Sequence, residues 1–290
     1  MMMIFGASGF LGAAMVNKLS KKHFVLAVVR PQSDISRIGL NKNVEILRKP
    51  EHEWATLVMS FKPEIVICAQ WQGVGKLDRE NQDIQWSNVI AIEAIAKKAL
   101  ESNCMRFVAL GSQAESAESH LLVPEEYIAS GETFYGKAKS ELVQRLFSIF
   151  EDTTTQLTWV RVFSVYGPME HRDSIFSQLG QALIDDKTFH IEEPTKKWSF
   201  LFQDDFARGM ELILERMGGA DIINLANPQL IEIQELPRFV GLTKISKNES
   251  IKQASAGFFP IITKLRKLGW ENRVSIEIGC KLTVDSMLQD

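Results

Sequence analysis

The 290-residue sequence contains few of the residues that hold metals or form disulfides. Its three cysteines are odd in number and lie far apart, at Cys68, Cys104 and Cys280. Sparse, unpaired cysteine is typical of a reducing compartment and argues against a disulfide framework. The five histidines never fall at ligand spacing from each other or from a cysteine, so no metal site is predicted.

Strong net charge and long apolar runs are also absent. A net charge of −3 gives no large positive field, so nucleic acid is not expected as a partner. Beyond Lys18, no segment has the run of uncharged apolar residues that a membrane span needs. The uncharged stretch before Lys18 lacks a basic leader and contains glycines, unlike a secretion signal. We therefore expect a cytoplasmic globular protein without a membrane partner.

The sequence does contain a regular alternation of short apolar runs and amphipathic segments. The runs FVLAVV, VEIL, EIVICA, MRFVAL and LTWVRVF alternate with stretches whose apolar residues have helical spacing. This alternation predicts an α/β fold with a doubly wound parallel sheet covered on both faces. The pattern loosens beyond Val165. We predict a main domain over residues 1–166 and a smaller cap over 167–290, with some segments free to return to the main sheet.

A glycine-rich turn, IFGASGFLG, follows the first apolar run and opens an amphipathic segment. In such a turn, glycines permit unusual backbone angles, close approach of a pyrophosphate and tight packing of helix on strand. The phosphates would lie at the helix N-terminus, where free N–H groups favour negative charge. The alternative is a turn with no ligand. The predicted cofactor contacts here are Gly6, Ser8, Gly9, Phe10, Leu11 and Gly12.

The residue after the second apolar run bears on which dinucleotide binds. The run FVLAVV is followed directly by Arg30. An acidic residue at this point binds the ribose hydroxyls of NAD, whereas an arginine accommodates the 2′-phosphate of NADP. The sequence therefore favours NADP over NAD, the alternative being an exposed arginine with no ligand.

Tyr135 and Lys139 are four residues apart in ETFYGKAKSELVQ, so they share one face of a helix. A free tyrosine has a pKa of ~10, and lowering it by about three units takes ~4 kcal/mol, plausible for nearby positive charge in a dry cleft. The phenol could then give a proton to a carbonyl oxygen as hydride reaches its carbon. Ser112 ends the strand MRFVALGS at the sheet edge where ligands bind, and could polarise the same carbonyl. The alternatives are a surface pair and an ordinary turn serine.

Taken together, these motifs resemble the extended short-chain dehydrogenase/reductase family of NAD(P)-dependent nucleotide-sugar epimerases, dehydratases and reductases. GASGFLG, the segment from SNVIAIEAI to FVALGS, YGKAK, RVFSVYGP, FLFQDDFARGM and LGWENRVSIEIGCKLTV follow the family's order from residue 4 to about 285. The resemblance implies a Rossmann domain, a C-terminal substrate-binding domain and the catalytic triad Ser112, Tyr135 and Lys139. It also implies that Lys139 binds the nicotinamide ribose and that residues 88–102 and 135–150 pair with their copies in a homodimer.

The sequence departs from the family pattern at several positions near the expected substrate. Ser164 replaces an asparagine in RVFSVYGP, and Trp198 stands where an arginine often grips the nucleotide diphosphate. The aspartate that contacts adenine has no counterpart, although Glu51 is close, and the usual HLAA has become ICAQWQGV. By the same resemblance, the expected substrate contacts are Gln113, Ser164 and Trp198.

The choice of reaction rests on three positions. Dehydratases of the family carry acidic residues directly after the active-site serine or threonine, where this chain has Gln113 and Ala114. Because Arg30 favours NADP, we predict NADP(H)-dependent reduction of a keto group, specifically the 4-keto group of a nucleotide-linked deoxysugar, with Tyr135 as proton donor. The alternative is an NAD-dependent nucleotide-sugar C4-epimerase. A non-catalytic NAD(P)-sensing regulator is a third reading, against which the Tyr–Lys pair argues.

Overall fold

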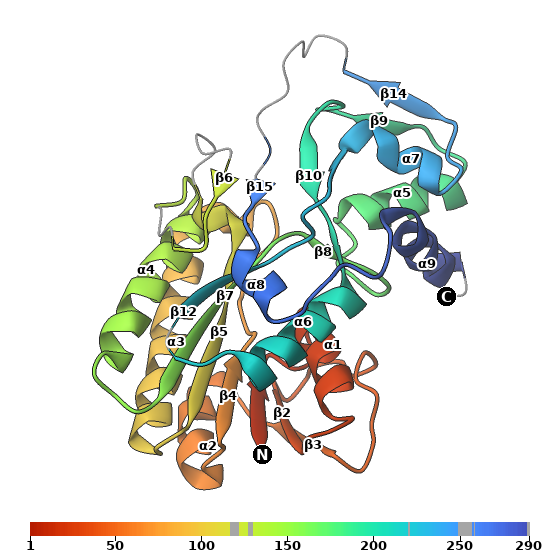
Figure 1. Cartoon of the computed structure of the whole chain (residues 1–290). Coiled ribbons are helices and arrows are strands. Elements are labelled where there is room, and N and C mark those ends of the chain that lie inside the picture. Colours follow the sequence, from red (N-terminus) through yellow and green to blue (C-terminus); the bar gives the residue numbers. More distant parts are fainter. Residues whose placement is uncertain (117–121, 127–129, 220, 249–256, 258, 289–290) are drawn as a thin grey trace.

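A seven-stranded parallel sheet forms the centre of the protein, in the order β12-β7-β5-β4-β1-β2-β3 (Figure 1). The computed structural model describes residues 1–116, 122–126, 130–219, 221–248, 257 and 259–288. The strands of the sheet are β1 (Met2–Phe5), β2 (Val25–Val29), β3 (Val44–Arg48), β4 (Ile65–Cys68), β5 (Arg106–Ser112), β7 (Gln156–Val162) and β12 (Asp221–Leu225). β1 and β2 are buried along their whole length. Their unbroken apolar sequences follow from burial on both faces of the sheet.

Helices cover both faces of this sheet (Figure 1). On one face lie α2 (Trp54–Phe61), α3 (Gln82–Glu101) and α4 (Phe134–Phe150). On the other lie α1 (Phe10–Leu19), α6 (Gln203–Arg216) and α8 (Thr263–Lys267). The predicted doubly wound α/β fold is confirmed.

The strand order reverses at β1, which pairs with β2 on one side and with β4 on the other. The connections from β1 and from β4 therefore leave in opposite directions. In open parallel sheets, ligands bind in the crevice that such a reversal opens beyond the carboxyl ends of the strands. The glycine turn after β1 and the segment after β4 both border this crevice.

Part of the chain beyond residue 166 belongs to the main sheet. β12 pairs in parallel with β7, with Ile222 opposite Trp159. Phe206 and Met210 of α6 pack in the same apolar core as Val16 of α1. A division at residue 166 therefore separates β12 and α6 from the sheet that they complete.

The remaining C-terminal elements form a smaller layer above the carboxyl ends of the strands (Figure 1). They are α5 (Ile175–Ile184), β9 (Phe189–Ile191), β10 (Lys197–Ser199), β13 (Leu230–Glu232), α7 (Leu236–Phe239), β14 (Ile245–Lys247) and α9 (Ile276–Leu288). Their core contains Tyr166 stacked on Phe176, with ring centroids 4.0 Å apart. We refer to this layer as the cap.

Short elements connect the cap to the sheet. Paired segments are β8 (Val165–Tyr166) with β11 (Leu201–Phe202), and β6 (Leu122–Val123) with β15 (Phe259–Pro260). The 3₁₀ turns are η1 (Glu51–Glu53), η2 (Asp78–Glu80), η3 (Gln113–Glu115) and η4 (Ile233–Glu235). In the described part of the chain, no helix has both the length and the apolar character to cross a membrane.

Candidate active site

The glycine turn after β1 has a geometry that only glycine allows at two positions. Gly6 has φ +73°, and a Cβ on it would lie 2.6 Å from the Cα of Gln70. A Cβ on Gly12 would lie 2.2 Å from the carbonyl oxygen of Gly6. Because these close contacts are with backbone atoms, a side chain at Gly6 would displace the segment after β4, and one at Gly12 would force the helix away from the strand end.

Gly9 begins α1 without a capping side chain. The first N–H groups of the helix therefore have no side-chain acceptor, and the helix dipole favours an anion there. A cleft of about 440 Å³ borders this turn and is lined by Gly6, Ser8, Gly9 and Arg30, among others. The residues present thus fit the pyrophosphate of a dinucleotide.

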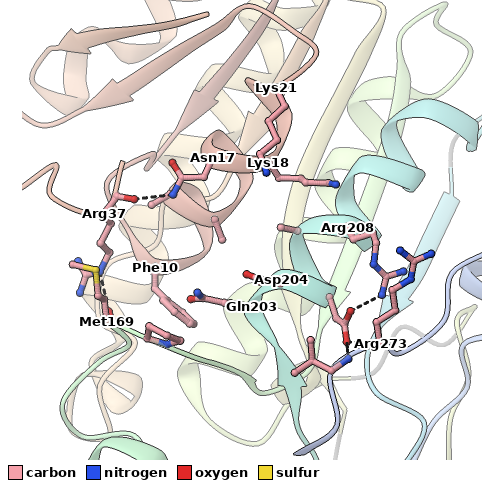
Figure 2. A pocket seen from close by; sticks show the side chains of 16 residues that line it. Phe10, Asn17, Lys18, Lys21, Arg37, Met169, Gln203, Asp204, Arg208 and Arg273 are labelled. Carbon is pink, nitrogen blue, oxygen red and sulfur yellow. Dashed lines mark hydrogen bonds and ion pairs between the residues drawn. The ribbon is translucent and has the colours of Figure 1, made fainter. Parts of the chain in front are cut away.

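The side chains of Phe10 and Leu11 do not line this cleft in the described structure. Phe10 lines a separate cavity between α1 and α6 (Figure 2), and Leu11 packs against the core. Any contribution of these two residues to phosphate binding would come from their backbone N–H groups. Sequence pattern alone could not separate backbone from side-chain contacts.

Arg30 lies in the cleft beside a carboxylate that the sequence analysis noted only as nearby. Its Nε is 3.9 Å from Oε1 of Glu51, and its side chain is 60% exposed. Glu51 also accepts a hydrogen bond from Gln72 Nε2. The strand end therefore presents both a positive and a negative group to an adenosine ribose.

Ser112, Tyr135 and Lys139 come together beside the carboxyl end of β5. Ser112 is the last residue of β5, while Tyr135 and Lys139 lie in the first turns of α4, whose N-cap is Thr133. A side-chain hydrogen bond joins Tyr135 to Ser112. Lys139 Nζ donates to the carbonyl oxygen of Leu110 at 2.6 Å. The three predicted catalytic residues thus form one cluster next to the dinucleotide cleft.

Burial controls the protonation of this cluster. Tyr135 is 8% exposed and Lys139 is 4% exposed. Burial raises the pKa of Tyr135, while its hydrogen bond with Ser112 and the charge of Arg79 act in the opposite direction. Burial lowers the pKa of Lys139 to about 7, with the Glu115 carboxylate opposing the shift. The phenol is therefore held as a proton donor, beside an ammonium that loses its charge near neutral pH.

Glu115 anchors the loop that carries Ser112, and the sequence analysis missed it. Its carboxylate accepts from the backbone N–H of Ser112, while the Ser112 hydroxyl accepts from the N–H of Ala114. The same buried carboxylate pairs with Arg161, whose Nε lies 3.1 Å away, and accepts from Trp159 Nε1. The spacing Ser-x-x-Glu is a capping-box signal that could have revealed this role.

Two further groups against Tyr135 were also missed. The indole ring of Trp71 meets the Tyr135 ring edge-on, with centroids 5.7 Å apart, and lies 3.6 Å from Lys139 Nζ. Arg79 Cζ is 5.2 Å from the centre of the Tyr135 ring. Trp71 stands within the unusual ICAQWQGV segment, but its sequence position did not indicate that it faces the catalytic lysine.

A larger cavity of about 570 Å³ lies against the cap, and Arg79, Ser164 and Trp198 line it. Ser164 Oγ accepts hydrogen bonds from Gln113 Nε2, at 3.0 Å, and from Trp198 Nε1. The three predicted substrate residues are therefore linked to one another. Since both lone pairs of this hydroxyl are used, its proton remains available to an acceptor in the cavity.

The model of one protein family, described as the NAD dependent epimerase/dehydratase family, matches residues 2–226. The chain belongs to this family. The match spans the sheet, the glycine turn and the catalytic cluster, so the resemblance seen in the motifs is confirmed. The protein is an NAD(P)-dependent enzyme, within the group of oxidoreductases and epimerases that the family comprises.

Individual relatives show the same fold. A UDP-glucuronate 4-epimerase of Thermodesulfobacterium geofontis is 36% identical over 138 residues, which cover 43% of this chain and 41% of that relative. The aligned part thus spans less than half of the relative's length. A UDP-glucose 4-epimerase of Thermotoga maritima, solved with UDP-glucose, has a TM-score of 0.85 at 20% identity, covering 99% of this chain and 98% of that one. A UDP-glucuronic acid 4-epimerase of Bacillus cereus, solved with NAD, has a TM-score of 0.86 at 19% identity, covering 99% and 96%.

A separate cavity lies between α1 and α6, beside side chains that form ion pairs (Figure 2). Its volume is about 440 Å³, and basic side chains from both helices border it. Lys18 Nζ lies 2.9 Å from Glu211, and Arg208 pairs with Asp205 on its own helix. The ion pair between Lys18 and Glu211 helps to hold α6 on α1, and we assign the α1–α6 cavity no catalytic or binding role.

Proposed function

We propose that the protein is a nucleotide-sugar C4-epimerase that works with a retained NAD. The observation that carries this proposal is the cluster of Ser112, Tyr135 and Lys139, in which Tyr135 contacts Trp71 of the dinucleotide cleft and Arg79 of the cavity under the cap. A relative with 36% identity over its aligned part is a UDP-glucuronate 4-epimerase, and relatives of the same fold are UDP-glucose and UDP-glucuronic acid 4-epimerases. They support the alternative that the sequence analysis ranked second.

In this function NAD would lie along the Gly6–Gly12 turn and supply hydride acceptance and return at C4 of the sugar. The Tyr135 phenolate takes up the proton of the C4 hydroxyl as that carbon is oxidised, and the resulting phenol returns the proton when the keto group is reduced. Ser112 bonds to Tyr135 and would contact the same sugar oxygen. When it is protonated, Lys139 places a positive charge 5.9 Å from the centre of the Tyr135 ring and favours the phenolate. Inversion at C4 requires the keto sugar to rotate so that its opposite face meets the cofactor. The 570 Å³ cavity offers space for this rotation.

The choice of NAD rests on the environment of Arg30. Glu51 lies 3.9 Å from the Arg30 guanidinium and would repel a 2′-phosphate, whereas it can accept hydrogen bonds from ribose hydroxyls. Arg30 itself is the observation that favours the second candidate, the NADP(H)-dependent 4-ketoreductase. The two candidates differ in one measurable respect: an epimerase recycles its cofactor, while a reductase consumes one NADPH per product.

The family resemblance adds a homodimer, which would pair the outer faces of α3 and α4 with their copies. α3 and α4 pack against one another on the same side of the sheet. Ile90 on the outer face of α3 is 63% exposed, and an apolar side chain there is suited to a partner. Ile90→Asp should convert a dimer to monomers in sedimentation analysis.

The proposed reaction is tested by incubating the purified protein with UDP-glucose or UDP-glucuronate and following the C4 epimer by NMR. We expect interconversion without net change in NADH or NADPH absorbance. Tyr135→Phe is the matched control, because a contaminating host epimerase would be unaffected by it. Stoichiometric NADPH oxidation with a 4-keto sugar, and no epimer, would instead favour the reductase.

A further inference from the structure

Arg79 is the cation at the reacting end of the cavity under the cap. It belongs to η2 and lines this cavity. Its Cζ lies 5.2 Å from the centre of the Tyr135 ring, and its Nε donates to the carbonyl oxygen of Val74 at 2.9 Å. The bond to Val74 fixes the guanidinium and leaves its terminal N–H groups for another acceptor.

Lys196, the other permanent cation of the cavity, is already neutralised, and His190, a cation only when protonated, has a carboxylate partner of its own. Lys196 Nζ lies 2.9 Å from Glu193, and His190 Nε2 lies 3.3 Å from Glu192. Among the described residues, by contrast, no carboxylate comes within ion-pair distance of Arg79. The cavity therefore holds one positive group that the protein itself does not neutralise.

The remaining carboxylates of the cavity weaken this charge little. Asp173 lies 3.5 Å from His171. Burial raises the pKa of Glu170 to about 7, so a large share of this side chain is uncharged at neutral pH. An anionic group beside Arg79 thus meets an attractive field.

A guanidinium recognises planar carboxylates and phosphates through paired N–H donors. In the proposed reaction the Tyr135 hydroxyl meets the oxygen on C4 of the sugar. C5, which carries C6, is bonded to C4, whereas the diphosphate is attached at C1 across the ring. An anion beside Arg79, and hence beside Tyr135, is therefore most simply a substituent at C6.

We propose that Arg79 binds a carboxylate at C6 of the sugar, so that the substrate is a nucleotide-linked hexuronate. This inference rests on the proposed function, because it takes C4 as the reacting carbon. A neutral hexose or a 6-deoxysugar would leave the terminal N–H groups of Arg79 to water. Charge-assisted hydrogen bonds of this kind correspond to a discrimination of about 10- to 100-fold.

The test separates binding from turnover. In a Tyr135→Phe background, which blocks turnover, calorimetry would compare UDP-glucuronate with UDP-glucose, with and without Arg79→Gln. We expect UDP-glucuronate to bind about 10- to 100-fold more tightly, and Arg79→Gln to remove that preference while changing UDP-glucose affinity little. Lys76→Gln is the matched control, since it removes a positive charge from an exposed side chain of the same loop.

Two results would overturn the inference: equal affinity of the two sugars, or an equal loss for both with Arg79→Gln, which would indicate a contact with the diphosphate. Turnover of the protein with an intact Tyr135 is then measured separately. A binding preference without epimer formation would contradict the proposed function and leave the assignment of Arg79 standing. Epimer formation without the binding preference would support the proposed function and contradict the assignment of Arg79.

Discussion

Lys139→Met should make the protein more stable while it removes activity. The ammonium of Lys139 is held in a nearly dry site between the Leu110 carbonyl and the Trp71 ring. Burial lowers its pKa from 10.5 to about 7. The side chain therefore costs folding free energy in full below about pH 7, and this cost falls as the pH rises from 7 toward 10.5. Methionine has a similar apolar stem and no charge to bury.

The difference in unfolding free energy between the wild type and Lys139→Met depends on pH. Between pH 7 and pH 10.5 the unfolded state binds one more proton at Lys139, so the free energy of unfolding rises with pH. The slope approaches about 1.4 kcal/mol per pH unit, and it is smaller near pH 7, where the folded group is half titrated. From pH 7 to pH 9 the wild type should gain about 2 kcal/mol relative to Lys139→Met.

Urea unfolding of nucleotide-free protein at pH 7, 8 and 9 measures this difference directly. Lys137→Met is the control, because Lys137 is an exposed lysine of the same helix and should give a pH-independent difference. Loss of the bond to Leu110 shifts the Lys139→Met curve by a constant and does not alter its slope. A stability difference that stays the same from pH 7 to pH 9 would refute the reasoning.

Other predictions concern proton transfer, the cap and the cofactor turn. Tyr135→Phe should lower turnover by about 10²- to 10⁴-fold in an epimerisation assay, with nucleotide binding retained; full activity would exclude Tyr135 as the proton carrier. Glu170→Gln should abolish a fall in unfolding free energy of about 3 kcal/mol that the wild type shows as pH rises from 4.5 to about 7, because the folded state keeps this proton longer; parallel pH curves would disprove it. Gly12→Ala should release the bound nucleotide, measured by extraction, since its Cβ would lie 2.2 Å from a carbonyl oxygen, whereas Gly218→Ala, with no neighbour within 4 Å, should retain it.

Much of the fold and of the candidate site could be predicted from features that are local in the sequence. The glycine turn is specified within seven residues, and Tyr135 and Lys139 share a helix face through their spacing alone. Ser112 could be found because an apolar strand run ends at it. Each of these features depends on neighbours in the sequence, which is why the sheet and the positions of Ser112, Tyr135 and Lys139 could be predicted without a structure.

Features that depend on distant segments could not be predicted in the same way. Arg30 was visible at its strand end, but Glu51, which faces it 3.9 Å away, comes from η1 after the next strand. Trp71 lies in the irregular segment after β4 and Arg79 in the short turn η2, and each contacts Tyr135, which is distant from both in the sequence. The return of residues 221–225 to the sheet likewise follows from pairing with β7 rather than from any local signal.

The central claim is that the enzyme inverts C4 by removing and returning the same hydride. It is tested most directly with UDP-glucuronate and UDP-glucose that carry deuterium at C4, incubated with the NAD-loaded protein and an excess of unlabelled NADH. We predict that a C4 epimer forms and that deuterium is retained at C4 in both substrate and product, because the cofactor stays bound between the two transfers. An epimer that carries protium from the added NADH at C4, or the absence of any epimer, would contradict the account.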